Sequence, residues 1–174
     1  MKKITNHLKN NIAIYMVLLA SVVIICVALF VTKDPTVEKV DTSMFRVVSV
    51  KEALKLFEED KANLLVISTS TCAATIKYVP SLKIAQAKDG YNVYYLELDE
   101  VSYESKEFQK LLKKLDMEYN LNGKVAKFSE FIGTTPMNVI IKNKKMVHGY
   151  IGTMDTDTLH TITSLYGVYS NEKN

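Results

Sequence analysis

The longest apolar stretch of the chain runs from residue 12 to residue 32 and contains no charged side chain. A helix of this length rises about 1.5 Å per residue and can cross roughly 30 Å of hydrocarbon. The pattern therefore predicts one transmembrane helix at 12–32. Lys2, Lys3 and Lys9 precede it, so the positive-inside bias predicts a cytoplasmic tail at 1–11 and an extracytoplasmic body.

A removable signal peptide is the alternative interpretation, because the apolar segment is N-terminal and has basic residues before it. The apolar run is longer than a usual signal core, and Phe30, Val31 and Thr32 stand at its polar edge in place of a small-x-small pair. Cys26 follows the bulky Ile25 inside the run, which favours a membrane-embedded side chain over a lipid-attachment site. We expect an uncleaved anchor.

Residues 33–44 are polar and contain Pro35, which is typical of a linker. The rest, 45–170, has the length of one domain with a single core. Within it, segments with strand patterns alternate with segments at helical spacing. The expected strands are 45–48, 63–68, 91–98, 137–141 and 146–151. Four helices are expected: one that begins after Ser49, one from Cys72 to about residue 87, one that includes 108–115, and one from Asp155 or Asp157 to Tyr166.

This order of elements, βαβαβαββα, predicts the fold class. Ser49 and Glu52 fit a capping box, and the apolar run 63–68 fits a central strand covered on both faces. The polar residues 142–145 predict a four-residue hairpin turn, while 119–133 has no clear pattern. We expect a mixed sheet sandwiched between helices.

Charge and composition exclude several classes of function. The net charge of +3 is accounted for by the three lysines before the apolar segment, so the rest of the chain is neutral by count. Nucleic acid is therefore not an expected partner. His7, His148 and His160 are scattered along the chain, so we expect no metal site and no cofactor.

Cys72 is the only cysteine outside the apolar segment, and it stands where a strand is expected to run into a helix. A thiol in the first turn of a helix is near unpaired backbone donors, which favour the thiolate. Thr75 occupies the place of the second cysteine of a Cys-x-x-Cys centre. Release of a bound partner must therefore depend on a thiol from another molecule. The alternative is a buried, inert cysteine.

Several spacings resemble those of the thioredoxin family. Pro80 lies eight residues after Cys72, and Thr135-Pro136 matches the family's proline opening a strand after a β-branched residue. Five mostly apolar residues then lead to Lys142-Asn143, and Gly152 lies sixteen positions beyond Pro136. The resemblance implies a thioredoxin-like mixed β-sheet flanked by helices, over about 45–169.

The resemblance also implies roles for individual residues. Cys72 corresponds to the catalytic cysteine, and Thr75 to the serine with which monothiol members stabilise the thiolate. Thr135-Pro136 corresponds to a cis peptide facing the cysteine, where, together with Thr71, it binds an extended substrate peptide. The alternative is a trans proline that only starts a strand.

The chain departs from the family in ways that bear on activity. Tryptophan is absent, Thr71-Cys72-Ala73-Ala74-Thr75 replaces the dithiol motif, and Val66 stands where the family has a buried acid. The resemblance thus implies a monothiol disulfide oxidoreductase rather than a dithiol reductase.

Two functional hypotheses follow. The first is a membrane-anchored, extracytoplasmic protein in which Cys72 exchanges disulfides with exported proteins or peptides. The second is a non-catalytic module that binds a peptide or a membrane transport component. The layout of short basic tail, single apolar segment and one domain resembles thioredoxin-like accessory proteins of bacteriocin export.

Overall fold

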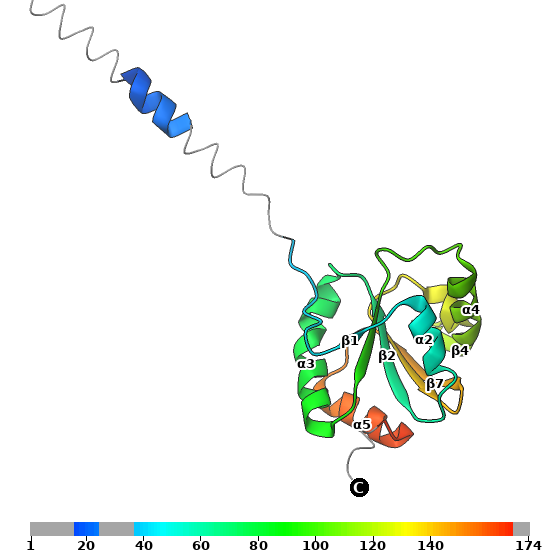
Figure 1. The fold of residues 1–174 in the computed structure, drawn as a ribbon. Coiled ribbons are helices and arrows are strands. Elements are labelled where there is room, and N and C mark those ends of the chain that lie inside the picture. The colour runs from blue at the N-terminus through cyan, green and yellow to red at the C-terminus, as the bar shows by residue number, and fades with distance from the viewer. Residues whose placement is uncertain (1–15, 25–36, 169–174) are drawn as a thin grey trace, which may run out of the picture. The chain divides into compact units, whose positions relative to one another are not determined.

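A computed structural model describes residues 16–24 and 37–168 (Figure 1). The chain forms two compact units, residues 1–37 and 38–174. In the first unit, residues 16–24 are helical. Within the described ranges, no helix combines the length and the apolar character needed to cross a bilayer. The cytoplasmic tail expected at 1–11, most of the span expected at 12–32, and 33–36 of the linker lie outside the described residues.

The second unit is built on a five-stranded sheet with the strand order β1-β3-β2-β6-β7. Its strands are β1 (Arg46–Val47), β2 (Asn63–Ser68), β3 (Val93–Glu97), β6 (Met137–Lys142) and β7 (Lys145–Ile151). β1, β3 and β2 are parallel, whereas β6 is antiparallel to β2, and β7 to β6. Leu65 in the centre pairs with Tyr94 on one side and Val139 on the other. The sheet is therefore mixed, as predicted.

Helices cover both faces of the sheet (Figure 1). They are α2 (Val50–Leu56), α3 (Ala73–Asp89), α4 (Lys106–Lys114) and α5 (Thr156–Tyr166). α3 contacts α5, and α2 contacts α4. Side chains of β2 alternate between the two cores, with Leu65 and Ile67 on the α2–α4 side and Leu64 and Val66 on the α3–α5 side. This three-layer α/β arrangement is the thioredoxin-like fold that the sequence predicts.

Local hydrogen bonds explain where two of the helices begin. Ser49 and Glu52 form the expected capping box: the Glu52 carboxylate accepts from the Ser49 N–H at 2.8 Å, and the Ser49 hydroxyl accepts from the Glu52 N–H at 3.3 Å. At α5 the carboxylate of Asp155 accepts from the Thr158 N–H at 2.7 Å. Asp155 is therefore the N-cap, which decides between the two aspartates considered from sequence.

The segment 119–133, which had no predicted element, contains a hairpin and a short helix. The strands β4 (Glu118–Leu121) and β5 (Lys124–Lys127) form a separate two-stranded sheet, followed by the 3-10 helix η1 (Phe128–Phe131). Asn122 and Gly123, both with positive φ, make the turn. The Tyr119 hydroxyl accepts from the N–H of Ile151 at 3.2 Å. The hairpin is thereby tied to β7, an edge strand of the main sheet.

The turn between β6 and β7 differs from the prediction. A four-residue turn was expected at 142–145, but Lys142 and Lys145 pair with each other and belong to the strands. Only Asn143 and Lys144 form the turn, both with positive φ. The four polar side chains indicate the exposed end of a hairpin, but their polarity does not show which residues still pair between the two strands.

Gly149 in β7 allows Phe128 of η1 to pack directly on the sheet. A Cβ at residue 149 would lie 2.7 Å from Cε2 of Phe128, which is fully buried, and would also meet Met146. We predict that Gly149→Ala lowers the free energy of unfolding by about 1–3 kcal/mol, since overpacking displaces buried groups. Urea unfolding of the full chain in detergent measures this. Phe128→Leu should relieve part of the effect, so strict additivity of the two changes would contradict this explanation.

Candidate functional site

The candidate site begins where β2 ends. β2 is followed by a short loop, and α3 starts at Ala73, so Cys72 is the N-cap of that helix. Its backbone is extended, with φ −66° and ψ 111°. Cys72 is a free cysteine with a partly buried side chain. The carboxyl ends of parallel strands are where open α/β sheets commonly bind ligands, and Cys72 lies at such an end.

The loop before β6 faces the thiol. The peptide bond between Thr135 and Pro136 is cis, as expected from the resemblance. The Cys72 thiol lies 3.6 Å from the backbone carbonyl oxygen of Thr135 and donates to it. Pro136 is buried, and its carbonyl accepts from the N–H of Gly152 at 2.8 Å. The fold therefore brings Cys72 close to Thr135 and Pro136, which lie more than sixty positions later in the sequence.

Thr75 and Thr71 are the other two residues expected at the site, and they differ from each other in burial. Thr75, on the first turn of α3, is fully buried, and its hydroxyl lies 2.6 Å from that of Ser68 at the end of β2. This pair joins the strand to the helix directly behind the thiol. Thr71 is exposed, and its side chain has no hydrogen-bond partner within the described part of the chain. A role for Thr71 would require contact with a bound molecule.

The surroundings of Cys72 change its pKa. Partial burial by itself raises the pKa, but hydrogen bonds from the side chains of Thr135 and Thr75, and from the backbone N–H groups of Thr75 and Ala74, lower it to about 7. The Thr135 carbonyl has the opposite preference, since only the protonated thiol can donate to it. The site therefore holds thiol and thiolate in comparable amounts near neutral pH.

Several contacts fix the loop that carries the thiol, and the sequence did not indicate them. The Asp99 carboxylate accepts from the Ser70 N–H at 2.6 Å, and the Tyr95 hydroxyl donates to the Thr69 carbonyl at 3.1 Å. The N–H of Val40 donates to the Ser70 carbonyl at 2.7 Å. Asp99 itself is exposed. Hydrogen bonds with Ser70 lower the pKa of Asp99. Ser70 and Asp99 are 29 positions apart, so no local sequence pattern connects them.

Among residues 16–24 and 37–168, no carboxylate or imidazole is hydrogen-bonded to the Cys72 thiol. Val66, at the position of the family's buried acid, is fully buried. His148 lies on β7, where burial lowers its pKa, and its Nδ1 is 3.5 Å from the hydroxyl of Tyr166 on α5. Within residues 16–24 and 37–168, no group of three or more His, Cys, Asp or Glu side chains could hold a metal ion.

Comparisons with known proteins give likenesses only among solved structures. No family model and no curated protein matches the chain. Plasmodium falciparum thioredoxin is 14% identical with a TM-score of 0.48, covering 70% of this chain and 98% of that chain. Chloroplastic thioredoxin z is 14% identical with a TM-score of 0.49, covering 71% and 94%. Oxidised mitochondrial thioredoxin 3 from Saccharomyces cerevisiae is 16% identical with a TM-score of 0.46, covering 71% and 96%.

The lowered pKa of Cys72 predicts the pH dependence of its alkylation. In a Cys26→Ser background, where Cys72 is the only thiol, the rate of reaction with iodoacetamide should rise through a midpoint at about pH 7, because the thiolate is the nucleophile. Thr75→Val removes a hydroxyl that favours the thiolate and should move the midpoint upward.

Thr71→Val is the matched control for this titration, because Thr71 is exposed and its side chain has no partner in the described residues. It should leave the midpoint unchanged. A midpoint near that of an ordinary thiol, about pH 8.5, in the parent protein would contradict the proposed stabilisation of the thiolate.

Proposed function

We propose that this protein is a membrane-anchored, extracytoplasmic thioredoxin-like protein whose single cysteine, Cys72, exchanges disulfides with exported proteins or peptides. The observation that carries the proposal is the position of the Cys72 sulfur, 3.6 Å from the Thr135 carbonyl beside Pro136. The partly exposed thiol and its pKa of about 7 support it, because a thiol with a pKa near ambient pH is well suited to attack a disulfide.

The proposed reaction starts with attack of the Cys72 thiolate on one sulfur of a partner's disulfide. The partner's S–S bond breaks, a mixed disulfide forms at Cys72, and the second partner sulfur leaves as a thiolate that takes a proton from water. In the usual dithiol centre a second cysteine then attacks the mixed disulfide. Thr75 fills that place and is buried, so a thiol from another molecule completes the exchange and regenerates Cys72.

Thr135 supplies the means to hold the partner chain in this proposal. Among the described residues none accepts a hydrogen bond from the Thr135 N–H, and its carbonyl is bonded only to the thiol. An extended peptide lying beside Cys72 can pair with both groups by strand addition. When the thiol ionises it no longer donates to the carbonyl, which frees that oxygen for the incoming chain.

The anchoring and the compartment rest on the N-terminal segment. The uncharged stretch 12–32 has the length of a transmembrane helix, and three lysines precede it. The helical part at 16–24 carries exposed apolar side chains, among them Leu19 and Ile24, each 67% exposed. A lipid environment would cover such side chains, which supports an anchor with the thioredoxin-like domain outside the cytoplasm.

A second candidate function is a binding module without redox activity, acting with a membrane transport component in peptide export. One observation favours it: buried Val66 cannot take part in proton transfer, which a carboxylic acid at that position could do. In this alternative the free backbone groups of Thr135 bind a peptide, and the sulfur of Cys72 takes no part.

Trapping of a partner at Cys72 distinguishes the two candidates. When membranes are alkylated and solubilised without reductant, we predict that mass spectrometry finds a mixed disulfide at Cys72. The Cys72→Ser variant should lose that species because no sulfur remains at the site. Cys26→Ser is the matched control and should retain it. If Cys72 is found only as free thiol, and Cys72→Ala keeps full function in cells, the exchange function is excluded and the binding module is favoured.

The proposed orientation in the membrane has its own test. In intact cells carrying the Cys26→Ser variant, we predict that a small membrane-impermeant maleimide labels Cys72 without lysis. A second variant, Thr5→Cys with both native cysteines changed to serine, places the thiol in the expected cytoplasmic tail and should react only after lysis. The reverse pattern of labelling would contradict the orientation.

A further inference from the structure

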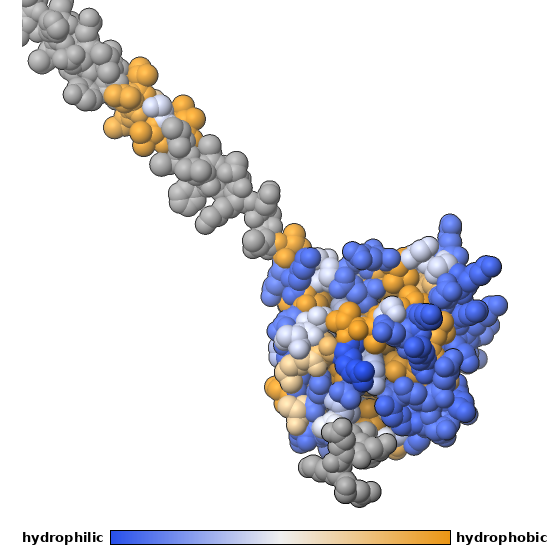
Figure 2. Space-filling view, in the orientation of Figure 1, coloured by the Kyte–Doolittle hydropathy of each residue, from blue (hydrophilic) through white to orange (hydrophobic). Residues whose placement is uncertain are grey.

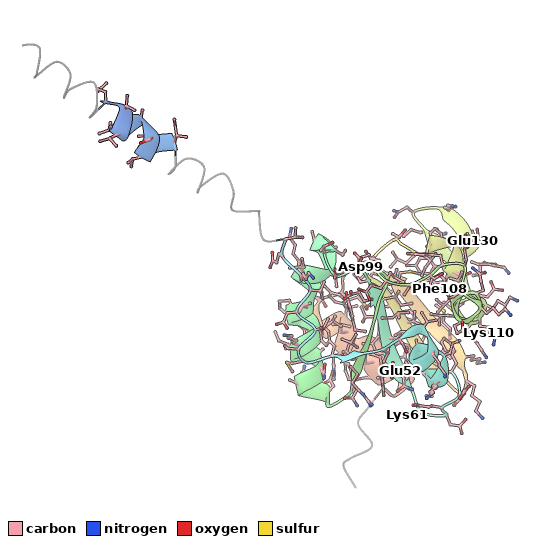
Figure 3. All side chains as sticks on the ribbon, turned by 45° about the horizontal axis from the view of Figure 1, so that its top comes forward. Glu52, Lys61, Asp99, Phe108, Lys110 and Glu130 are labelled. Carbon is pink, nitrogen blue, oxygen red and sulfur yellow. The ribbon has the colours of Figure 1, made fainter. Side chains whose placement is uncertain are left out.

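A basic groove lies between α2 and α4. These two helices cover the sheet face opposite α3 and α5 (Figure 1). The groove has a cavity volume of about 550 Å³. Five lysines line it, from two directions: Lys51 and Lys55 belong to α2, and Lys110, Lys113 and Lys114 belong to α4. Figure 3 looks nearly along α4 and shows Lys110 on its outer side, away from the buried Phe108. We call this feature the α2–α4 groove.

Nearby acids balance the positive charge of the α2–α4 groove only in part, and Glu52 on α2 interacts electrostatically with Lys55. Its lining contains two glutamates, Glu58 and Glu107, so the formal excess is three positive charges. Within the described residues, none of the five lysine ammonium groups lies within 4.0 Å of a carboxylate. The chain after residue 11 is neutral by count, so this excess is a local segregation of charge and calls for an anionic ligand.

Two apolar side chains, Leu54 and Phe57, line the groove together with the lysines, and we call these two its floor. Leu54 is partly exposed, whereas Phe57 is 2% exposed and its ring centre lies 6.0 Å from the ammonium group of Lys114. Figure 2 shows hydrophobic surface among the hydrophilic residues on this side of the domain. A ligand that fits must therefore offer an apolar stripe as well as negative charge.

These features together select one class of ligand. A free phosphate or other small anion would leave the apolar floor uncovered. A flat bilayer surface would contact the two helices that form the walls and leave the floor between them empty. An amphipathic helix with acidic residues beside its apolar stripe matches both the floor and the walls. We propose that the α2–α4 groove binds an acidic, amphipathic peptide segment of a partner protein.

This binding site is separate from the thiol site. Its lining comes from α2, α4 and the residues next to α2, and includes no residue of the loop that carries Cys72 or of the loop at Thr135. A partner bound in the groove leaves Cys72 free for a second molecule. Peptide binding in the α2–α4 groove goes beyond the disulfide exchange proposed for Cys72, and neither proposal depends on the other.

The test uses the full chain in zwitterionic micelles and two synthetic peptides. One is a fluorescent helix-forming peptide of about four turns, with leucines at i, i+3, i+4 and i+7 and glutamates elsewhere. The other has the same composition, scrambled so that the leucines share no face. We expect the first peptide to bind at least tenfold more tightly by fluorescence anisotropy, and its affinity to fall as salt is raised.

Variants assign that binding to the groove. Lys51→Gln with Lys110→Gln removes one charge from each wall and should weaken binding about tenfold. Lys77→Gln with Lys88→Gln is the matched control, since both lysines are exposed on α3 and have no carboxylate partner among the described residues. Cys72→Ser should bind the peptide as the parent does. Unchanged circular dichroism and thermal unfolding show that each variant is folded.

Three results would overturn the proposal. The first is equal or undetectable binding of the two peptides, and the second is an equal loss in the α3 control variant. The third concerns lipid and uses the full chain in phosphatidylcholine nanodiscs, where the peptide should protect Lys51 and Lys110 from acylation. If phosphatidylglycerol protects these lysines and the peptide does not, the groove binds a membrane surface instead.

Discussion

The burial of β2 between two helical layers is the constraint on which the rest of the structure depends. All six of its residues are buried, and it pairs with β3 on one side and β6 on the other. Neither neighbour can shift by one residue without moving apolar side chains between the two cores and exposing others. The ends of the three strands are thereby held in register, and so are the loops that leave them.

The thiol site follows from this register. Ile67 of β2 pairs with Met137 of β6, so the loop after β2 and the loop before β6 meet at the same edge of the sheet. Cys72 lies on the first and Thr135 on the second. The sulfur lies next to the Thr135 carbonyl because β2 and β6 are paired in a fixed register. The helix that starts after Cys72 supplies the backbone dipoles that act on the thiolate.

The environment of the sulfur combines opposing influences. Burial favours the neutral thiol, whereas hydroxyl and amide donors favour the thiolate, and the result is a pKa of about 7. Reactivity alone does not make a reductase, because the buried Thr75 cannot resolve a mixed disulfide. The α2–α4 groove is charged and lies on a different part of the domain. We propose disulfide exchange at Cys72 and peptide binding in the groove, and such a separation of sites would suit a protein that lacks an internal resolving thiol.

Features that depend on neighbouring residues could be predicted from the sequence, whereas features that depend on contacts between distant residues could not. The capping box at Ser49 and the apolar run of β2 are local patterns, and both were predicted. The hairpin at 118–127 was missed although Asn122-Gly123 is a turn signal, because its strands are short and mostly exposed. Its place is decided by the contact of Tyr119 with β7, a residue pair that no local pattern connects.

The sequence by itself determined the order of the strands and helices of the main sheet, the single thiol at the end of a strand, the apolar N-terminal segment and, through the resemblance, the cis proline expected opposite the thiol. It determined these because each depends on neighbouring residues or on fixed spacings. Only the tertiary structure decided that Asp99 holds the thiol loop, that Thr75 is buried against Ser68, and that lysines from two helices form one groove. Those features require side chains distant in sequence to meet, and it is the packing of both helical layers on the central strand that brings them together.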